Sequence, residues 1–174
     1  MLRWWGAPPG DVAHDAVALA AAWADPEVAR WTAVPAARDA AAAARWIAGE
    51  PERRAHRLAL DLVVGSPADG GRQVLGEVGL AHLDDRGWAE LGFWLAPAAR
   101  GRGLATVAVA RCARWALTEL GLRRVWARTD PANERAAGVL VRAGFLRRGE
   151  APGPAGGPAG RSVVWTRDAA NLRP

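Results

Sequence analysis

The feature that most constrains the fold of this chain is a helical stretch, residues 103–120, that stands between two short apolar segments, 88–95 and 123–129. Its apolar side chains recur at helical spacing, and they are Val109, Cys112, Ala113, Ala116 and Leu120. A helix that joins two strands of one sheet returns the chain to its starting end, so the two strands run parallel and the connection is right-handed. The sequence therefore predicts one parallel crossover.

Three short apolar segments predict an antiparallel meander that feeds this crossover. They are residues 56–64, 73–83 and 88–95, and the breaks between them, 65–71 and 84–87, are rich in Gly, Pro and Asp. Such clusters form the turns that connect neighbouring strands. We therefore expect three consecutive antiparallel strands.

The remaining segments add helices and edge strands. Residues 2–5 predict a short edge strand, and helical patterns cover 15–31, with a break at Asp25–Pro26, and 38–49, from Asp39 to Gly49. Later segments predict a helix over 133–145, closing strands at Phe145 and 162–166, and a flexible loop over 151–160. With no internal repeat and no domain boundary, we expect a single α+β domain over residues 1–174.

Composition limits the environment in which the chain works. No apolar run approaches the roughly 18 residues of a membrane span. Gly6 and the Pro8–Pro9 pair interrupt the N-terminus before a signal-like apolar core can form. We therefore expect a cytoplasmic protein with no membrane partner. Cys112, the single cysteine, lies inside an apolar helical pattern and is expected to be a packed hydrophobe rather than a nucleophile.

Positive charge gathers where the predicted helix begins, in the stretch "RGRGLAT" at residues 100–106. The first amides of a helix have no intrahelical partner and lie at the positive end of its dipole, and glycines let an anion approach them. Arg100 and Arg102 add forked donors that suit a diphosphate. Loop chemistry alone leaves two interpretations open, a phosphate cradle and an arginine-rich helix start on the surface.

The spacing of this loop excludes the common nucleotide loops. A Walker loop needs a lysine, and all 23 basic residues are arginine. A dinucleotide fingerprint needs a third glycine where the chain has Ala105 or Thr106. An RNA-binding Arg/Gly tract would be repeated, so no nucleic-acid partner is expected. The remaining interpretation is that this loop holds a diphosphate at the start of the helix.

Several motifs in order resemble the GNAT acyltransferases, and within them the branch that acetylates the N-terminal α-amino groups of ribosomal proteins. They are "DPEVARWT" (25–32), "LGFWLAPAARGRGLAT" (91–106) and "LGLRRVWARTDPANERAAGVLVRAGF" (120–145). Within the second motif, Arg100, Gly103 and Ala105 match the Arg-x-x-Gly-x-Ala signature of that family's pyrophosphate loop. The resemblance covers nearly the whole chain and implies the GNAT fold.

The resemblance also implies that acetyl-coenzyme A lies between two splayed parallel strands, 88–95 and 123–129. Its pantetheine arm would pair with the backbone at Phe93 and Leu95. Its pyrophosphate would lie on the loop and helix start formed by Arg100, Gly101, Arg102, Gly103, Leu104, Ala105 and Thr106. Gly92 suits a bulge at the middle of the opening strand. Asn133 matches the family's cofactor-contacting asparagine, and asparagine is also among the best helix N-caps.

The implied reaction is transfer of an acetyl group to a primary amine, with a protein N-terminal α-amine ahead of a small amine as acceptor. A carboxylate can take the proton of the amine, and a backbone N–H can stabilise the oxyanion. We expect Glu90 to be the base and the Phe93 amide to bind the oxyanion. Burial in an apolar run would make Glu90 a better proton acceptor. An exposed glutamate on the polar face is the competing interpretation, and Glu77 is the reserve candidate.

The chain departs from the family pattern at the general acid. It has no tyrosine, and Ala136 stands where this branch has a serine three residues after the asparagine. Either water or the substrate ammonium supplies the proton, or catalysis is weak. The alternative function is therefore an acyl-coenzyme A binding sensor with a GNAT fold.

The resemblance also implies an acceptor pocket in the helical first third, where Trp31 and Trp46 could line a groove for a peptide end or a flat amine. His14, His56 and His82 are too scattered to suggest a metal site. The resemblance is compatible with a homodimer, and the sequence leaves the oligomeric state open.

Overall fold

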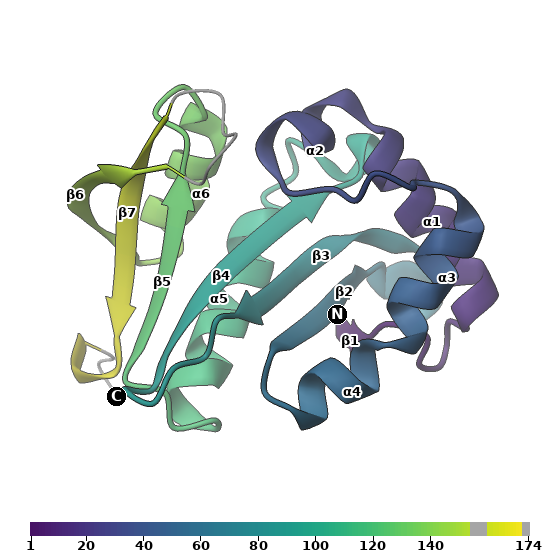
Figure 1. Cartoon of the computed structure of the whole chain (residues 1–174), viewed down its shortest axis with the longest axis horizontal. Coiled ribbons are helices and arrows are strands. Elements are labelled where there is room, and N and C mark those ends of the chain that lie inside the picture. Colours follow the sequence, from purple (N-terminus) through teal and green to yellow (C-terminus); the bar gives the residue numbers. More distant parts are fainter. Residues whose placement is uncertain (154–159, 172–174) are drawn as a thin grey trace.

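The computed structural model describes residues 1–153 and 160–171, in which seven strands form one sheet with helices on both faces (Figure 1). The strands are β1 (Leu2–Trp4), β2 (Ala59–Gly65), β3 (Val74–Ala81), β4 (Trp88–Leu95), β5 (Arg124–Thr129), β6 (Leu146–Pro152) and β7 (Arg161–Asp168). Their order across the sheet is β1-β2-β3-β4-β5-β7-β6. The expected α+β fold class is confirmed.

Six α-helices in the described part of the chain accompany the sheet. They are α1 (Val12–Ala24), α2 (Pro26–Trp31), α3 (Ala40–Ala48), α4 (Glu50–Ala55), α5 (Leu104–Thr118) and α6 (Glu134–Arg142). Three short 3₁₀ turns lie at Pro67–Asp69, Pro97–Ala99 and Ala169–Asn171. No helix in residues 1–153 and 160–171 is both long enough and apolar enough to cross a bilayer.

Strand pairing confirms both the predicted meander and the predicted crossover. β1, β2, β3 and β4 pair antiparallel in succession. β4 and β5 pair parallel and are joined by α5, whereas β5 with β7 and β7 with β6 are again antiparallel. The only parallel pair among the described strands is therefore the one that the crossover imposes.

The apolar face of α5 packs on one side of the sheet, against β3, β4 and β5. Val109, Cys112, Ala113 and Ala116 are each 0% exposed, as their spacing predicts. Burial raises the pKa of the Cys112 thiol to about 12, which fits the prediction of a packed side chain. Leu120 was predicted on this face, and this is wrong: it follows the end of α5 and is 40% exposed.

Helices α1 and α3 build a separate core on the opposite face of the sheet. Its buried side chains include Trp5, Trp23, Ile47 and Trp94. The ring of Trp46 meets those of Trp5 and Trp23 edge to face, with centroids 6.2 and 6.3 Å apart. Because large rings from α1, α3, β4 and the residue that follows β1 meet here, this face of the sheet is held by aromatic packing.

Acidic side chains determine where several helices begin. Asp11, Asp25 and Asp39 each accept a backbone N–H from the first turn of α1, α2 and α3. The cap at Asp11 starts α1 at Val12, earlier than the predicted start at residue 15.

Two predicted boundaries near other elements also differ from the structure. α4 was not predicted, and because it occupies residues up to Ala55, β2 begins at Ala59 instead of residue 56. Ala151 and Pro152 belong to β6 instead of a loop, and residues 154–159 of the predicted flexible loop lie outside the described residues.

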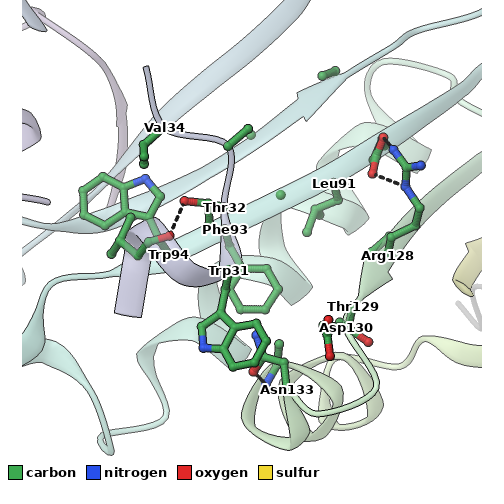
Figure 2. Close-up of a pocket in the computed structure, with 18 of the residues that line it drawn as sticks. Trp31, Thr32, Val34, Leu91, Phe93, Trp94, Arg128, Thr129, Asp130 and Asn133 are labelled. Atoms are coloured by element: carbon green, nitrogen blue, oxygen red, sulfur yellow. Dashed lines mark hydrogen bonds and ion pairs between the residues drawn. The ribbon is translucent and has the colours of Figure 1, made fainter. Parts of the chain in front are cut away.

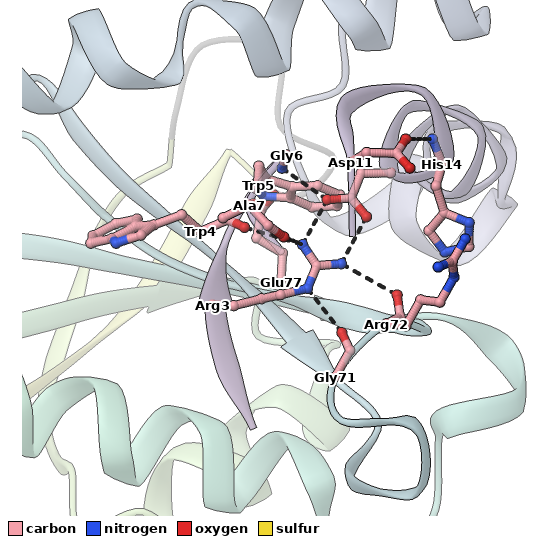
Figure 3. Close-up of polar contacts among 11 residues, drawn as sticks. Arg3, Trp4, Trp5, Gly6, Ala7, Asp11, His14, Gly71, Arg72 and Glu77 are labelled. Carbon is pink, nitrogen blue, oxygen red and sulfur yellow. Dashed lines mark hydrogen bonds and ion pairs between the residues drawn. The ribbon is translucent and has the colours of Figure 1, made fainter. Parts of the chain in front are cut away.

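A buried ion pair joins the edge strand β1 to α1 (Figure 3). Arg3 Nη1 and Nη2 donate to the two oxygens of Asp15, each at 2.7 Å, and the side chain of Asp15 is fully buried. Arg3 also donates to the carbonyl of Gly71 at 2.9 Å, and the Gly6 N–H donates to Asp15 at 2.9 Å. The pair is therefore satisfied on both sides and connects three segments that are distant in sequence.

We expect Asp15→Ala to destabilise the protein by about 3–5 kcal/mol, because the substitution leaves the Arg3 guanidinium buried without its counter-charge. The free energy of unfolding from urea titrations measures this effect. Asp11→Ala, which removes only an exposed helix cap, is the control and should cost about 1 kcal/mol. Equal losses in the two variants would contradict this account of the ion pair.

Candidate functional site

The candidate site opens where β4 and β5 separate. The two strands share only three residue pairs, from Trp88↔Arg124 to Glu90↔Trp126. Beyond that point β4 stays in continuous register with β3 up to Leu95, whereas β5 stays paired with β7 up to Thr129. The expected bulge at Gly92 is wrong, since no register shift interrupts β4 against β3. The opening arises because the two halves of the sheet diverge.

Backbone groups of β4 face this opening. The Ala96 N–H donates to the Leu75 carbonyl in the direction of β3, at 2.9 Å. Because backbone groups alternate in direction along a regular strand, the N–H groups of Phe93 and Leu95 point the other way, toward the opening. On the side of the opening, no strand in the described part of the chain pairs with β4 beyond Glu90. An extended ligand can therefore add to this edge as a strand would.

The loop 100–106 leads from β4 into α5. Gly101 and Gly103 both have φ of +74°, in the left-handed region, and a Cβ on either would meet no atom within 4 Å. Gly103 is the N-cap of α5, and no side chain caps this helix, unlike α1, α2, α3 and α6. The first amides of α5 therefore lie at an open, glycine-lined helix start that can accept an anion.

Arg100 turns away from this helix start. Its Nε donates to the Leu95 carbonyl at 3.0 Å, and its Nη2 pairs with Asp25 at 2.7 Å. Arg100 is the main reason that the pKa of Asp25 lies below its usual range. The guanidinium thus connects the end of β4 to the N-cap of α2, whereas Arg102 is exposed. Through these two contacts, Arg100 supports the shape of the loop.

Asn133 lies at the start of α6, across the opening from β4. Its side-chain oxygen accepts the Ala136 N–H at 3.1 Å, so it acts as the N-cap of α6. Asn133 and Ala136 both line the cavity between the strands, so an N-cap and a ligand contact are compatible at this position.

The opening continues into a cavity of about 730 Å³ (Figure 2). Its walls come from α2 and the segment after it, from β3 and β4, and from the end of β5 with the start of α6. Trp31 and Trp46, which the sequence placed in an acceptor groove, both line it. The volume suits a small-molecule or peptide-end ligand.

Glu90 lines the cavity at the last position where β4 pairs with β5. Both of its oxygens accept hydrogen bonds from Arg128 on β5, at 2.9 and 3.0 Å (Figure 2). The imidazole of His82 lies 3.9 Å away. Each Glu90 oxygen therefore keeps one lone pair that can accept a proton while Arg128 holds the carboxylate. Sequence reasoning missed Arg128, because nothing local to β5 indicates that its guanidinium reaches across to β4.

Glu77 lies on β3 opposite Trp94 and faces the same cavity. Trp5 Nε1 donates to its carboxyl at 2.9 Å. Burial raises the pKa of Glu77 to about 8, and the nearby charge of Asp61 adds to the effect. A carboxyl that titrates near neutral pH inside a cavity is a candidate proton acceptor.

No group of three or more His, Cys, Asp or Glu side chains in residues 1–153 and 160–171 could hold a metal ion.

Comparisons with known proteins identify the relatives of this arrangement. Residues 10–146 match the family profile described as an acetyltransferase (GNAT) domain. The Bacillus subtilis protein YdaF, whose name calls it a candidate ribosomal N-acetyltransferase, is 36% identical over 77 residues. That alignment covers 44% of this chain and 42% of YdaF, less than half the length of the relative.

Two solved structures share the fold. The ribosomal-protein-S5-alanine acetyltransferase of Vibrio fischeri has a TM-score of 0.81 and 21% identity, over 99% of this chain and 94% of its own. Mycobacterium smegmatis RimJ, solved in complex with CoA-disulfide, has a TM-score of 0.83 and 21% identity, over 99% and 83%. The likeness extends over the whole sheet and the helices on both of its faces.

We expect the free energy of unfolding of the Glu77→Gln variant to rise relative to that of the natural chain as pH rises from about 4.5 to about 8. In this window the carboxyl is protonated in the folded chain and ionised in the unfolded one, so the stability of the natural protein falls with rising pH. Glutamine does not titrate and can still accept from Trp5. The difference should reach roughly 2–4 kcal/mol above pH 8 and then stay constant.

Urea unfolding at about pH 5, 7 and 9 measures this difference. Glu119→Gln, at an exposed position, is the control and should show no such trend. A Glu77→Gln effect that is the same at all three pH values would rule out a raised pKa at Glu77.

Proposed function

Since the chain belongs to the family of GNAT acetyltransferase domains, we propose that it transfers the acetyl group of acetyl-coenzyme A to a primary amine, with a protein N-terminal α-amine as first candidate and a small amine as second. The observation that carries the proposal is the uncapped, glycine-lined start of α5 beside the opening between β4 and β5. This arrangement offers one site for a diphosphate and one for an extended arm.

The residues around the opening fit the groups of coenzyme A. The amides of residues 101–106 would hold the pyrophosphate, because the start of α5 has unpaired N–H groups and no competing side chain. The backbone of Phe93 and Leu95 would pair with the pantetheine arm, and Asn133 would contact it from α6. The complex of Mycobacterium smegmatis RimJ with CoA-disulfide supports this choice of ligand. Acetyl-coenzyme A supplies the electrophilic thioester when bound.

The side chains of the cavity would then handle the proton of the acceptor amine. We assign Glu90 as the general base, because it lies where β4 and β5 part. Arg128 would hold the Glu90 carboxylate in place until the amine arrives. The Phe93 N–H, which faces the opening, would stabilise negative charge on the acetyl oxygen. Glu77 is the competing base, since its pKa of about 8 suits proton transfer near neutral pH.

The chain lacks the residues that would serve as general acid in the family pattern. Ala136 lines the cavity and carries no hydroxyl, and the chain has no tyrosine. Protonation of the leaving thiolate would therefore come from water or from the acceptor ammonium. The same observation favours the second candidate function, an acyl-coenzyme A binding sensor, and turnover of an amine acceptor separates the two.

We expect Gly103→Val to weaken acetyl-coenzyme A binding at least tenfold. A valine at φ of +74° is strained, and its side chain projects where the pyrophosphate would lie. Isothermal titration calorimetry with acetyl-coenzyme A, coenzyme A, ATP and NAD measures the affinity and its selectivity.

The matched control is Gly121→Val, because Gly121 has φ of +69° and open surroundings but lies beyond the other end of α5. It should retain coenzyme A affinity. Equal affinity of the natural chain and Gly103→Val would argue against the phosphate site, and absence of acetyl-coenzyme A binding in the natural chain would overturn the proposed function.

We expect Glu90→Gln to lower kcat about 100-fold or more, because it removes the proton acceptor. The pH–rate profile separates the two carboxyls. If Glu77 is the base instead, Glu77→Gln abolishes a limb near pH 8 and Glu90→Gln retains it. Thiol release with a peptide acceptor measures both, and unchanged kcat in Glu90→Gln would refute our assignment.

A further inference from the structure

The part of the cavity between β2 and β4 has a floor without side chains. Gly79 on β3 is the register partner of Gly92 on β4, and Asp61 on β2 is the partner of Gly79. Register partners present their side chains on the same face of a sheet. A Cβ on Gly92 would meet no atom within 4 Å. The three positions therefore form a hollow that runs from the free edge of β4 to the Asp61 carboxyl.

The Asp61 carboxyl is held from one side and leans into this hollow on the other. Its Oδ2 accepts from Arg53 Nη2 at 3.3 Å. Its Oδ1 lies 3.0 Å from the point that a Cβ on Gly79 would occupy. In the part of the chain that the structure describes, the hydrogen bonds of the Asp61 side chain run only to Arg53. Oδ1 is thus available to a donor that enters the hollow.

Other acidic side chains gather around this carboxyl. Glu50, Asp61 and Glu77 are mutually close enough that Asp61 raises the pKa of the other two, although burial is the larger cause in each. Two guanidinium groups, Arg53 and Arg54, pair with this group. A cation that enters the hollow would therefore be attracted by Asp61 and would favour the ionised form of its neighbour Glu77.

Aromatic rings enclose the same space. Trp23, Trp46 and Trp94 line the cavity. The Arg53 guanidinium lies over the Trp46 ring, 4.1 Å from its centroid, so a ring in this cavity already faces a cation. Indole rings also pack well against the apolar spacer of an amphipathic amine.

We propose that Asp61 determines acceptor specificity: its Oδ1 binds a second cationic group of the acceptor, an ammonium or guanidinium that is not itself acetylated. This inference rests on the proposed transferase function, because the reacting amine must lie near Phe93 and Glu90. Asp61 is two strand spacings from Gly92, about 10 Å between Cα atoms. The acceptor must therefore carry its two nitrogen groups several bonds apart.

The first test uses the natural protein and matched acceptors. One pair is a peptide with a free N-terminus followed by arginine, and the same peptide with citrulline, which keeps the shape and loses the charge. The other pair is a diaminoalkane and the monoaminoalkane of equal chain length. We expect about tenfold higher kcat/KM for the charged member, through KM, in at least one pair. The pair that responds identifies a basic peptide or a small polyamine as the source.

The second test uses substitutions. Asp61→Asn keeps the shape and should abolish the preference for the charged member while the uncharged member retains its kcat. Asp130→Asn is the control, because Asp130 lines the same cavity outside the Gly79–Gly92 hollow. It should keep the preference. Loss of the preference in both variants would mean that the general field of the cavity, and not Asp61, selects the acceptor.

Measurements of acceptor binding distinguish failure of this inference from failure of the proposed function. Calorimetry with the coenzyme A-loaded natural protein compares the two members of each pair and needs no turnover or variant. Tighter binding of the charged member in at least one pair supports the inference. Equal binding within both pairs, or equal kcat/KM within both pairs, overturns it while transfer itself stands. Absence of acetyl-coenzyme A binding overturns the proposed function instead.

Discussion

The separation of β4 from β5 is the constraint on which the rest of the site depends. Two parallel strands that share only three residue pairs leave the backbone of Phe93 and Leu95 exposed at an internal edge of the sheet. An unpaired internal edge is costly unless something else satisfies its polar groups. The divergence is stable because each strand is fully paired on its other side, β4 with β3 and β5 with β7. The Arg128–Glu90 hydrogen bonds bridge the strands at the point where they part.

The two walls of the opening have different chemistry because they come from different elements. At one end, α5 begins without a capping side chain, and its amides and glycines offer a positive potential. On the face that carries α1 to α4, Asp61, Glu77 and Glu90 surround a floor made by two glycines. An anion is thus favoured at the start of α5 and a cation in the cavity, which is the polarity that an acetyl donor with a diphosphate and an amine acceptor would need.

The acidic end relies on contacts far from the opening. Arg3 and Asp15 hold β1 against α1, and Trp5 in the same segment donates to Glu77 (Figure 3). Arg53 on α4 holds Asp61 and stacks on Trp46. These side chains connect three helices of the first half of the chain, α1, α3 and α4, to the sheet. The charge and the shape of this acidic end are therefore set by packing in a core separate from the one under α5.

Local pattern was sufficient for most elements. The helical spacing around Cys112 predicted the buried face of α5, and the Gly and Asp clusters at 65–71 and 84–87 predicted the meander turns. α4 was missed because six residues with a proline and four charges carry no helical apolar period. Leu120 was misplaced because spacing alone does not reveal that the helix ends before it.

The sequence by itself determined the order of the strands and of the helices other than α4, the parallel crossover and the glycine-rich start of α5, because each follows from residue spacing within one segment. Only the tertiary structure decided which charges meet. Arg128 reaches Glu90 from another strand, Arg100 turns back to Asp25, and Asp61 lies beside a hollow between Gly79 and Gly92. These partners lie 38, 75 and 18 or more positions apart. Such contacts depend on strand register and on the divergence of the sheet, and neither is encoded in any single stretch of the chain.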